Sequence, residues 1–218
     1  MLNPKIKVIG VEPAGASCMK ESLRQGKVVT LPQVNTIADG TAVKRPGEKL
    51  FPYIQENVDE IITIDDNELI VAFLDMVENH KMIVENSGLL TVAALKHIKA
   101  EKKKVVSILS GGNMDVITLS SIVQHGLIQR DRVFTVSVLL PDKPGELARV
   151  SSLLAEQHGN IIKLEHNQFI SINRNAAVEL RITMEAFGTD HKNQIVSALT
   201  DAGYRPKLVK FKGTYSEM

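Results

Sequence analysis

The chain has 218 residues, with 26 basic residues against 25 acidic ones and a formal net charge of +1. Because the positive and negative charges nearly balance, the chain has no excess of basic residues, and neither nucleic acid nor an anionic membrane is expected as a partner. A single cysteine excludes an internal disulfide framework and fits a reducing cytoplasm. No run approaches the roughly 20 apolar residues of a membrane span, and no leader pattern is present. A cytoplasmic protein is therefore expected.

The first part of the chain alternates between short apolar runs and helical spacing. Four runs are typical of buried parallel strands, at 6–11, 59–64, 82–85 and 104–109. Four helical patterns follow them, at 14–24, 65–80, 87–100 and 114–126. Asp65 and Glu68 have the spacing of a capping box at the start of the second helix. The alternation predicts an open α/β sheet.

After Gly126 the pattern changes to that of a small α+β unit. Apolar alternation predicts strands at 131–140, 160–169, 175–187 and 204–211, and amphipathic spacing predicts helices at 147–159 and 190–203. The order is β-α-β-β-α-β, which is the ferredoxin-like, split βαβ arrangement. A polar stretch near 129–131 separates the two parts, so we predict domains at 1–129 and 130–218.

The stretch "SILSGGN" (107–113) lies where a predicted strand gives way to a helix. Ligands of open α/β sheets bind beyond the carboxyl ends of the strands, which is where Ser110 falls. Gly111 and Gly112 permit a flat ring or a phosphate to approach the backbone closely, and the hydroxyl of Ser110 is an available donor or acceptor. The alternative is an ordinary turn in which Ser110 or Asn113 caps the helix.

Four stretches occur in order, "VIGVEPAGA", "TIADGTAVKRPGE", "VENSG" and "SILSGGN". Together they resemble the pyridoxal-phosphate-dependent threonine and serine dehydratases of fold type II, and the split βαβ unit resembles their ACT regulatory domain. The fold class that this resemblance implies is an incomplete open parallel sheet of a fold type II enzyme followed by an α+β ACT domain. The implied reaction converts L-threonine to 2-oxobutanoate and ammonia, in isoleucine formation or in catabolism.

The resemblance also implies cofactor-binding residues. Ser110 matches the serine whose hydroxyl bonds the pyridine nitrogen of pyridoxal phosphate, and Gly111 follows it at the ring end. Gly40 matches a loop glycine that approaches the substrate, and Glu85 matches an acid near the ring. A turn glycine with positive φ is the alternative for Gly40, and a solvent-facing side chain is the alternative for Glu85.

Several positions depart from the family pattern. Asn86 and Leu89 stand where the family has Pro or Gly and then Ala. Relatives of the serine racemase branch hold a divalent cation at positions that match Glu12, Ala16 and Cys18. A thiol replaces the third oxygen ligand here, and hard cations prefer oxygen, so no metal is expected.

The family's aldehyde-holding lysine and its glycine-rich phosphate loop are not found in this sequence. We therefore assign no catalytic residue and expect this chain alone not to dehydrate threonine. An uncovered sheet face is expected to cause either self-association or assembly with an upstream enzyme half. The alternatives are a non-catalytic, amino-acid-sensing or assembly subunit, and a dehydratase that acts on serine.

ACT domains pair edge to edge and bind an amino-acid effector at the interface, so the resemblance implies a homo-oligomer. The turn after the first ACT strand contains Asp142, which is placed to bind the effector ammonium, and Gly145, which allows a tight turn before a helix that favours an anion. Asn160 begins the facing strand. Ordinary turn and cap chemistry is the alternative for Asp142 and Asn160.

Overall fold

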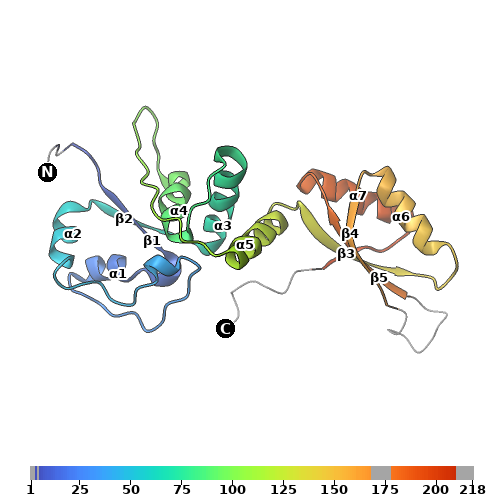
Figure 1. Cartoon of the computed structure of the whole chain (residues 1–218), viewed down its shortest axis with the longest axis horizontal. Helices are drawn as coiled ribbons and strands as arrows, with labels where there is room; N and C mark the ends of the chain where they lie inside the picture. Colours follow the sequence, from blue (N-terminus) through green and yellow to red (C-terminus); the bar gives the residue numbers. More distant parts are fainter. Residues whose placement is uncertain (1–2, 4, 168–177, 210–218) are drawn as a thin grey trace. The chain divides into compact units, whose positions relative to one another are not determined.

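The computed structural model describes residue 3 and residues 5–167 and 178–209, and it divides into two compact units, Met1–Val123 and Gln124–Met218 (Figure 1). Helix α5 (Val116–Gln129) crosses this division. The predicted domain boundary after residue 129 coincides with the end of that helix and stays a prediction. Within the described residues no helix has the length and apolar character needed to cross a membrane.

The first unit combines two parallel strands with helices. Its main elements are β1 (Ile9–Pro13), α1 (Cys18–Gln25), α2 (Phe51–Asn57), β2 (Glu60–Ile64), α3 (Asp66–Asp75) and α4 (Asn86–Ala93), with short helical turns at Ala14–Ala16, Asp39–Thr41, Met76–His80 and Ala94–His97. Strand β1 pairs with β2 in parallel, with Ile9 opposite Glu60 and Pro13 opposite Ile64. Helix α2 lies in a stretch where the sequence pattern predicts no regular structure before residue 53.

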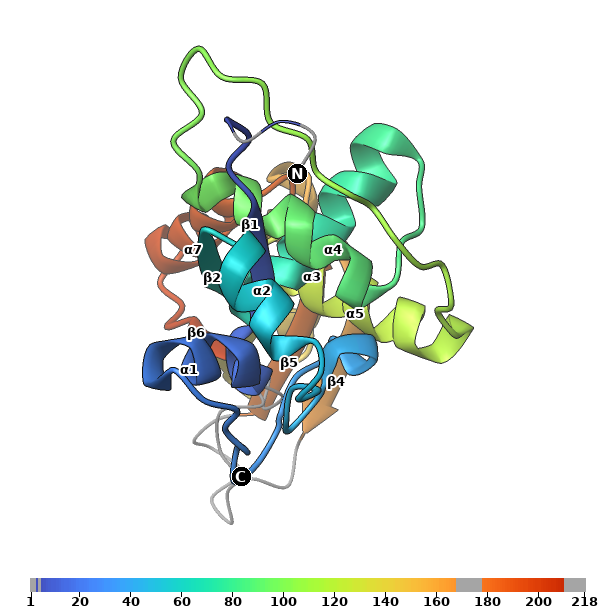
Figure 2. The ribbon, with the colours of Figure 1, turned by 90° about the vertical axis from the view of Figure 1, so that its left-hand side faces the viewer.

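Two predicted strands, 82–85 and 104–109, are wrong. In the described residues both segments run without strand pairing, and Figure 2 shows the chain between α4 and α5 as a long extended excursion. A strand needs a hydrogen-bonded neighbour, and β1 and β2 pair only with each other among the described residues. Val106 and Ile108 are consequently 87% and 71% exposed, although their sequence is typical of a buried strand.

The core of the first unit is mainly helical. Helix α3 begins at the predicted capping box, in which the Asp65 side chain accepts from the Asn67 backbone N–H at 2.9 Å and the Glu68 side chain accepts from the Asp65 N–H. Phe73 and Leu69 of α3 are fully buried with residues of α4 in one apolar cluster. This packing places the start of α4 against the loop that contains Gly40.

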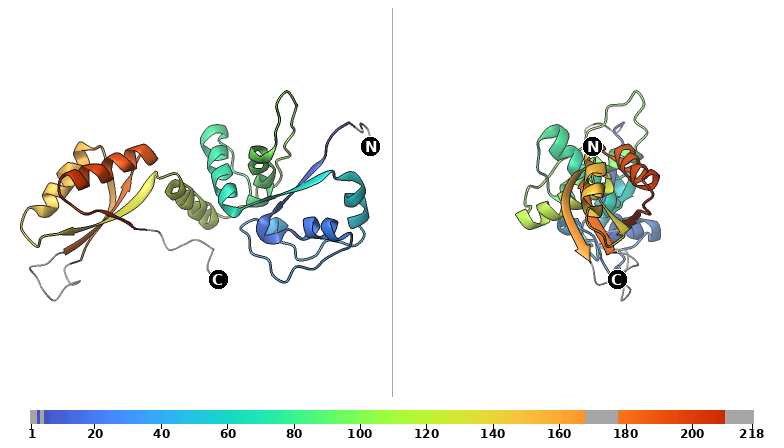
Figure 3. Two further views of the ribbon diagram at one scale, coloured as in Figure 1. Left: turned by 180° about the vertical axis from the view of Figure 1, so that it is seen from behind. Right: turned by 90° about the vertical axis from the view of Figure 1, so that its right-hand side faces the viewer.

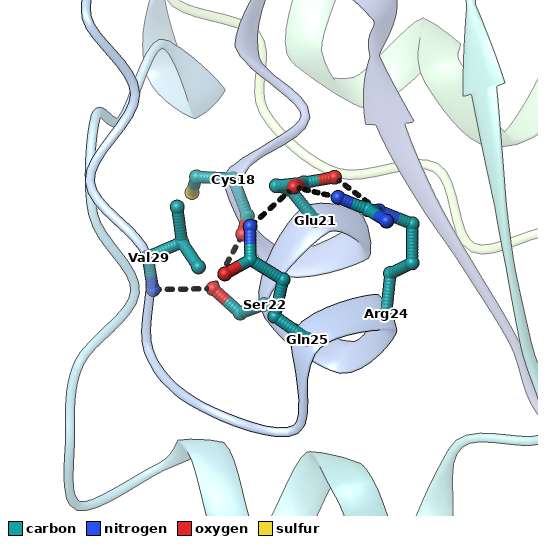
Figure 4. Close-up of polar contacts among 6 residues, drawn as sticks. All are labelled: Cys18, Glu21, Ser22, Arg24, Gln25 and Val29. Carbon is teal, nitrogen blue, oxygen red and sulfur yellow. Dashed lines mark hydrogen bonds and ion pairs between the residues drawn. The ribbon is translucent and has the colours of Figure 1, made fainter.

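Helix α1 is tied to the segment that follows it by a buried serine (Figure 4). The Ser22 hydroxyl donates to the carbonyl oxygen of Cys18 at 2.7 Å and accepts from the backbone N–H of Val29 at 2.9 Å. Gly26 ends the helix with φ 67°, a conformation that glycine adopts at little cost. The chain therefore turns sharply out of α1 into the long 27–50 segment.

The second unit has the predicted ferredoxin-like fold. Its elements are β3 (Val133–Leu140), α6 (Glu146–Glu156), β4 (Asn160–Asn167), β5 (Val178–Glu185), α7 (Thr189–Asp201) and β6 (Lys207–Val209). The antiparallel sheet has the order β4-β5-β3-β6, and both helices lie on one face of it (Figures 1 and 3). Alternate residues of β3 and β5 are buried beneath the helices, in a core that includes Val136, Leu154 and Ile182.

Candidate functional site

Three segments that are far apart in the sequence meet in the first unit. They are the loop at 37–40, the residues 85–88 at the start of α4, and the stretch 110–113 before α5. The 85–88 segment is central because it contacts the other two. Gly88 is buried against the carbonyl oxygen of Ser110, which occupies the place where a β-carbon would project. The sequence order and helix packing thus bring four predicted cofactor-binding residues, Gly40, Glu85, Ser110 and Gly111, into one region.

Glu85 is half-buried and turned into this region instead of facing solvent. Its carboxylate Oε2 accepts from the backbone N–H of Asn113 at 3.3 Å, and its own N–H donates to the carbonyl oxygen of Gly111 at 3.4 Å. Gly111 has φ 81°, and any side chain there would overlap the carboxylate of Glu85. Glycine is thus needed at 111 for backbone conformation and for close approach.

Gly40 lies against Ser87 at the first turn of α4. Gly40 does not adopt a positive φ, so the turn-glycine alternative fails, and a β-carbon there would lie 2.8 Å from the Ser87 hydroxyl oxygen. That hydroxyl is buried and has no hydrogen-bond partner within the described residues. Ser87 was not predicted as a site residue, and the only signal for it was a polar residue in the first turn of α4, which lies against the loop that contains Gly40.

Asn86 anchors the loop that contains Gly40 to the start of α4. Its amide Nδ2 donates to the carbonyl oxygen of Ile37 at 2.9 Å, and the residue is only 5% exposed. The side-chain Oδ1 is buried without a partner among the described residues. The family departure at Asn86 therefore has a structural role, which is to fix the loop against the start of α4. Leu89, the other departure, is fully buried in the core.

Ser110 is exposed, and it does not cap the following helix. Asp115 performs that function, since its Oδ1 accepts from the backbone N–H groups of Ile117 and Thr118, each at 2.9 Å. The alternative in which Ser110 or Asn113 is the cap is therefore wrong. The Ser110 hydroxyl remains available at the surface beside Gly111.

Glu12 supports helix α1. Its Oε1 accepts from the Met19 N–H and its Oε2 from the Lys20 N–H, both at 2.8 Å, at the end of the helix that carries partial positive charge. Burial, and after it the charge of Glu12, raises the pKa of the nearby Cys18 thiol. In the described part of the chain no three His, Cys, Asp or Glu side chains gather as metal ligands would.

The predicted effector residues of the second unit do not gather within one chain. Asp142 is exposed in the turn after β3, and Gly145 begins α6 with φ 92°. Asn160 lies at the opposite end of the sheet, because β3 and β4 both run antiparallel to β5 and Asn160 pairs with Glu185. The Asn160 amide also donates to the Glu185 carboxylate at 2.8 Å.

Comparisons with known proteins agree with this architecture. Residues 1–111 match the family described as "Pyridoxal-phosphate dependent enzyme", and residues 134–204 match the ACT domain. Over 95% of the chain, it is 36% identical to an L-threonine ammonia-lyase of Geobacter sulfurreducens and 31% identical to one of Thermotoga maritima. The chain spans about half the length of these relatives, 52% in each case.

Solved structures add two further relatives. A processed threonine deaminase isoform 2 from Solanum lycopersicum is 35% identical with a TM-score of 0.52, covering 56% of this chain and 37% of that one. Maize serine racemase is 34% identical with a TM-score of 0.50, covering 60% and 41%. The family match extends over just more than half of the chain and includes Gly40, Glu85, Ser110 and Gly111. The chain belongs to the pyridoxal-phosphate-dependent enzymes, with an ACT domain after the catalytic-domain part.

Proposed function

We propose that this chain contributes the ring-end part of the cofactor site of an L-threonine ammonia-lyase. The observation that carries the proposal is the convergence of Gly40, Glu85, Ser110 and Gly111 in one region of the first unit. The names of the Geobacter and Thermotoga relatives support threonine as the substrate. A cytoplasmic location and a role in isoleucine formation belong to the same proposal.

The residues present fit the ring end of pyridoxal phosphate. Gly111 has no side chain beside Glu85, and the Ser110 hydroxyl is exposed next to it. These residues provide a surface for close approach and an exposed hydrogen-bonding hydroxyl, as a flat heterocycle requires. No lysine is among the residues that these described contacts bring together, so we assign none the role of anchoring the aldehyde.

The chemistry divides between the cofactor and this chain. When bound, the cofactor withdraws electrons from the amino-acid Cα, which lets the α-proton and then the β-hydroxyl leave. Ser110 holds the ring nitrogen through a hydroxyl, which leaves that nitrogen largely unprotonated, whereas a carboxylate would favour its protonation. The Gly40 loop and Glu85 orient the ligand from the side of α4.

Calorimetry with phosphopyridoxyl-threonine, the reduced adduct of cofactor and substrate, tests this proposal because the adduct needs no lysine. We expect the full chain to bind it and the Ser110→Ala variant to bind about tenfold more weakly, as the loss of one hydrogen bond predicts. Ser107→Ala is the matched control, since it removes a serine hydroxyl three residues away. Equal affinity in all three proteins, or no binding, would contradict the proposal.

A second role concerns partners of the first unit. The segments next to the proposed cofactor site expose several large apolar side chains. The exposed fractions are 87% for Val106, 71% for Ile108 and 83% for Ile117. We propose that the remainder of a catalytic domain covers this surface, as in a complete open sheet. Co-expression with the catalytic part of a relative, followed by co-purification, tests this assembly. A non-catalytic, amino-acid-sensing subunit would show effector binding without any adduct binding.

For the second unit we propose pairing through β4 and binding of an amino-acid effector. Strand β4 is the sheet edge and is exposed along most of its length. If two β4 edges pair antiparallel about a two-fold axis, Asn160 of the second copy comes to the end of the sheet where Asp142 and Gly145 lie. The two ends of one effector would then be held by two copies.

Isoleucine, valine and threonine are the effectors to titrate by calorimetry. We expect at least one to bind at millimolar concentration or below, and the Asp142→Asn and Asn160→Ala variants each to weaken it. Binding that survives both substitutions would contradict the site. A sedimentation measurement that gives a monomer at micromolar concentration would contradict the pairing.

A further inference from the structure

The first turn of α4 contains polar groups that the proposed ring contacts do not use. Ser87 Oγ and Asn86 Oδ1 are both buried, and neither has a partner within the described residues. Buried polar atoms are almost always satisfied, because an unpaired one loses its hydration without a replacement. Two such atoms lie on successive residues beside the Gly40 loop, where both are able to pair with a bound ligand.

The neighbours of Ser87 indicate what kind of group that is. The Glu85 carboxylate oxygen Oε1 and the Ser87 hydroxyl oxygen both lie close to one side of Gly40, at 3.6 and 2.8 Å from the point where its β-carbon would be. Asn86 Oδ1 only accepts hydrogen bonds, and so does the Glu85 side chain in its carboxylate form. A region of acceptors and one hydroxyl favours a ligand that brings its own O–H or N–H donor.

Gly40 lies over the Ser87 hydroxyl on this side. It has no side chain, is itself exposed and belongs to the short turn Asp39–Thr41. The anchor of this loop, the bond from Asn86 to the Ile37 carbonyl, lies three residues earlier. A ligand that reaches Ser87 from this side would have to displace the turn, with the base of the loop held in place by that bond.

We propose that Ser87 is a specificity-determining residue that recognises the β-hydroxyl of a hydroxyamino-acid ligand. The inference rests on the proposed function, since it places the amino-acid part of the ligand at the Gly40 loop. A hydroxyl on the ligand pairs with Ser87 Oγ, which both donates and accepts. A ligand with a plain alkyl side chain leaves that hydroxyl unpaired, as it is without ligand among the described residues, and so gains no hydrogen bond there.

Two reduced adducts that differ in a single oxygen test this proposal. Phosphopyridoxyl-threonine carries the β-hydroxyl and phosphopyridoxyl-2-aminobutyrate lacks it. We expect the full-length chain to bind the threonine adduct about tenfold more tightly by calorimetry. In Ser87→Ala the ratio of the two affinities falls to near one, whereas affinity for the 2-aminobutyrate adduct changes little.

Two controls complete the design. Ser87→Thr keeps the hydroxyl and should keep the preference. Ser107→Ala removes a different buried hydroxyl, also without a partner in the described part of the chain, and should leave the preference intact. If the unaltered chain binds both adducts equally, or if Ser87→Ala keeps the preference, the role of Ser87 is wrong. If neither adduct binds, the cofactor site itself is wrong, so the two failures are distinguishable.

Discussion

The two units of this chain differ in how completely they pair their own strands. The second unit forms a four-stranded antiparallel sheet whose core includes fully buried residues of two strands and both helices, such as Val138, Ile182 and Leu199. The first unit pairs two strands among its described residues and leaves strand-like segments exposed, with Val106 87% accessible. The contrast shows that apolar sequence alone does not make a strand, because a strand also requires a neighbour.

Truncation of a buried side chain should have the largest effect on stability, and the effect should be confined to the unit that contains the substitution. Ile182 of β5 and Leu69 of α3 are both fully buried. We expect Ile182→Ala and Leu69→Ala each to lower the free energy of unfolding of its own unit by about 2–5 kcal/mol. Amide hydrogen exchange resolves the units, and a loss of protection that spreads equally through both would contradict their independence. Ile182→Val is the mild control, at about 0.5–1.5 kcal/mol.

Substitution of Gly111 should be the next most damaging change, and it tests the site of the first unit. Gly111→Ala meets both a positive φ of 81° and the side chain of Glu85. Gly26→Ala is the matched control, because φ is 67° there but nothing lies within 4 Å. We expect the control to cost about 1–2 kcal/mol and Gly111→Ala to cost clearly more in urea unfolding. Equal costs would show that the Glu85 contact is absent.

A smaller effect is expected from an ion pair of the second unit. Burial works to raise the pKa of Asp131, but hydrogen bonds from Lys192 and Thr189 outweigh it and hold the pKa below its ordinary value. The contribution to stability is therefore present above about pH 4 and lost as the pH falls further. We expect Lys192→Met to remove about 0.5 kcal/mol at neutral pH and to flatten the acid limb of the unfolding curve.

The matching pair in the first unit should matter less. Hydrogen bonds from Arg24, followed by one from Gln25 (Figure 4), lower the pKa of Glu21 to about 2, but the Arg24 side chain is 69% exposed, against 13% for Lys192. Solvent screening weakens such a pair. The same urea titration should show a smaller change for Glu21→Gln than for Lys192→Met. The reverse order would contradict the greater burial of Lys192 compared with Arg24.

Substitution of Val106 should have the smallest effect on folding. Because this side chain is 87% exposed, Val106→Lys should change the free energy of unfolding by less than about 0.5 kcal/mol. It should nevertheless reduce the apparent mass in light scattering if the exposed segment associates. An unfolding change of several kcal/mol would mean that Val106 is buried in solution.

The sequence predicted the second unit well because β3, β5 and both helices carry clear amphipathic patterns. Alternation in 131–140 matches β3, and Gly159 follows the end of α6. In the first unit, Asp65 and Glu68 correctly indicated a helix start. The predicted strands at 82–85 and 104–109 were wrong. An apolar run becomes a buried strand only where a neighbouring strand pairs with it, and no described strand lies beside these segments.

The candidate site was predictable only in part. The order of the motifs predicted Gly40, Glu85, Ser110 and Gly111. These residues were recognisable because close approach to a ligand requires glycine and hydrogen bonding requires polar side chains. Ser87 was missed, because a serine in the first turn of a helix is ordinary in sequence and unusual only once its burial is known. The separation of Asp142 from Asn160 follows from strand direction, because β3 and β4 both run antiparallel to β5, so that the end of one and the start of the other lie at opposite ends of the sheet.

Hydrogen exchange of the full chain with and without pyridoxal phosphate tests the central claim most directly. We predict that the cofactor slows exchange together in residues 37–40, 85–88 and 110–113, with no change across 133–167. Slowing confined to the second unit, or absent from these three segments, would contradict the assignment of a cofactor site to the first unit.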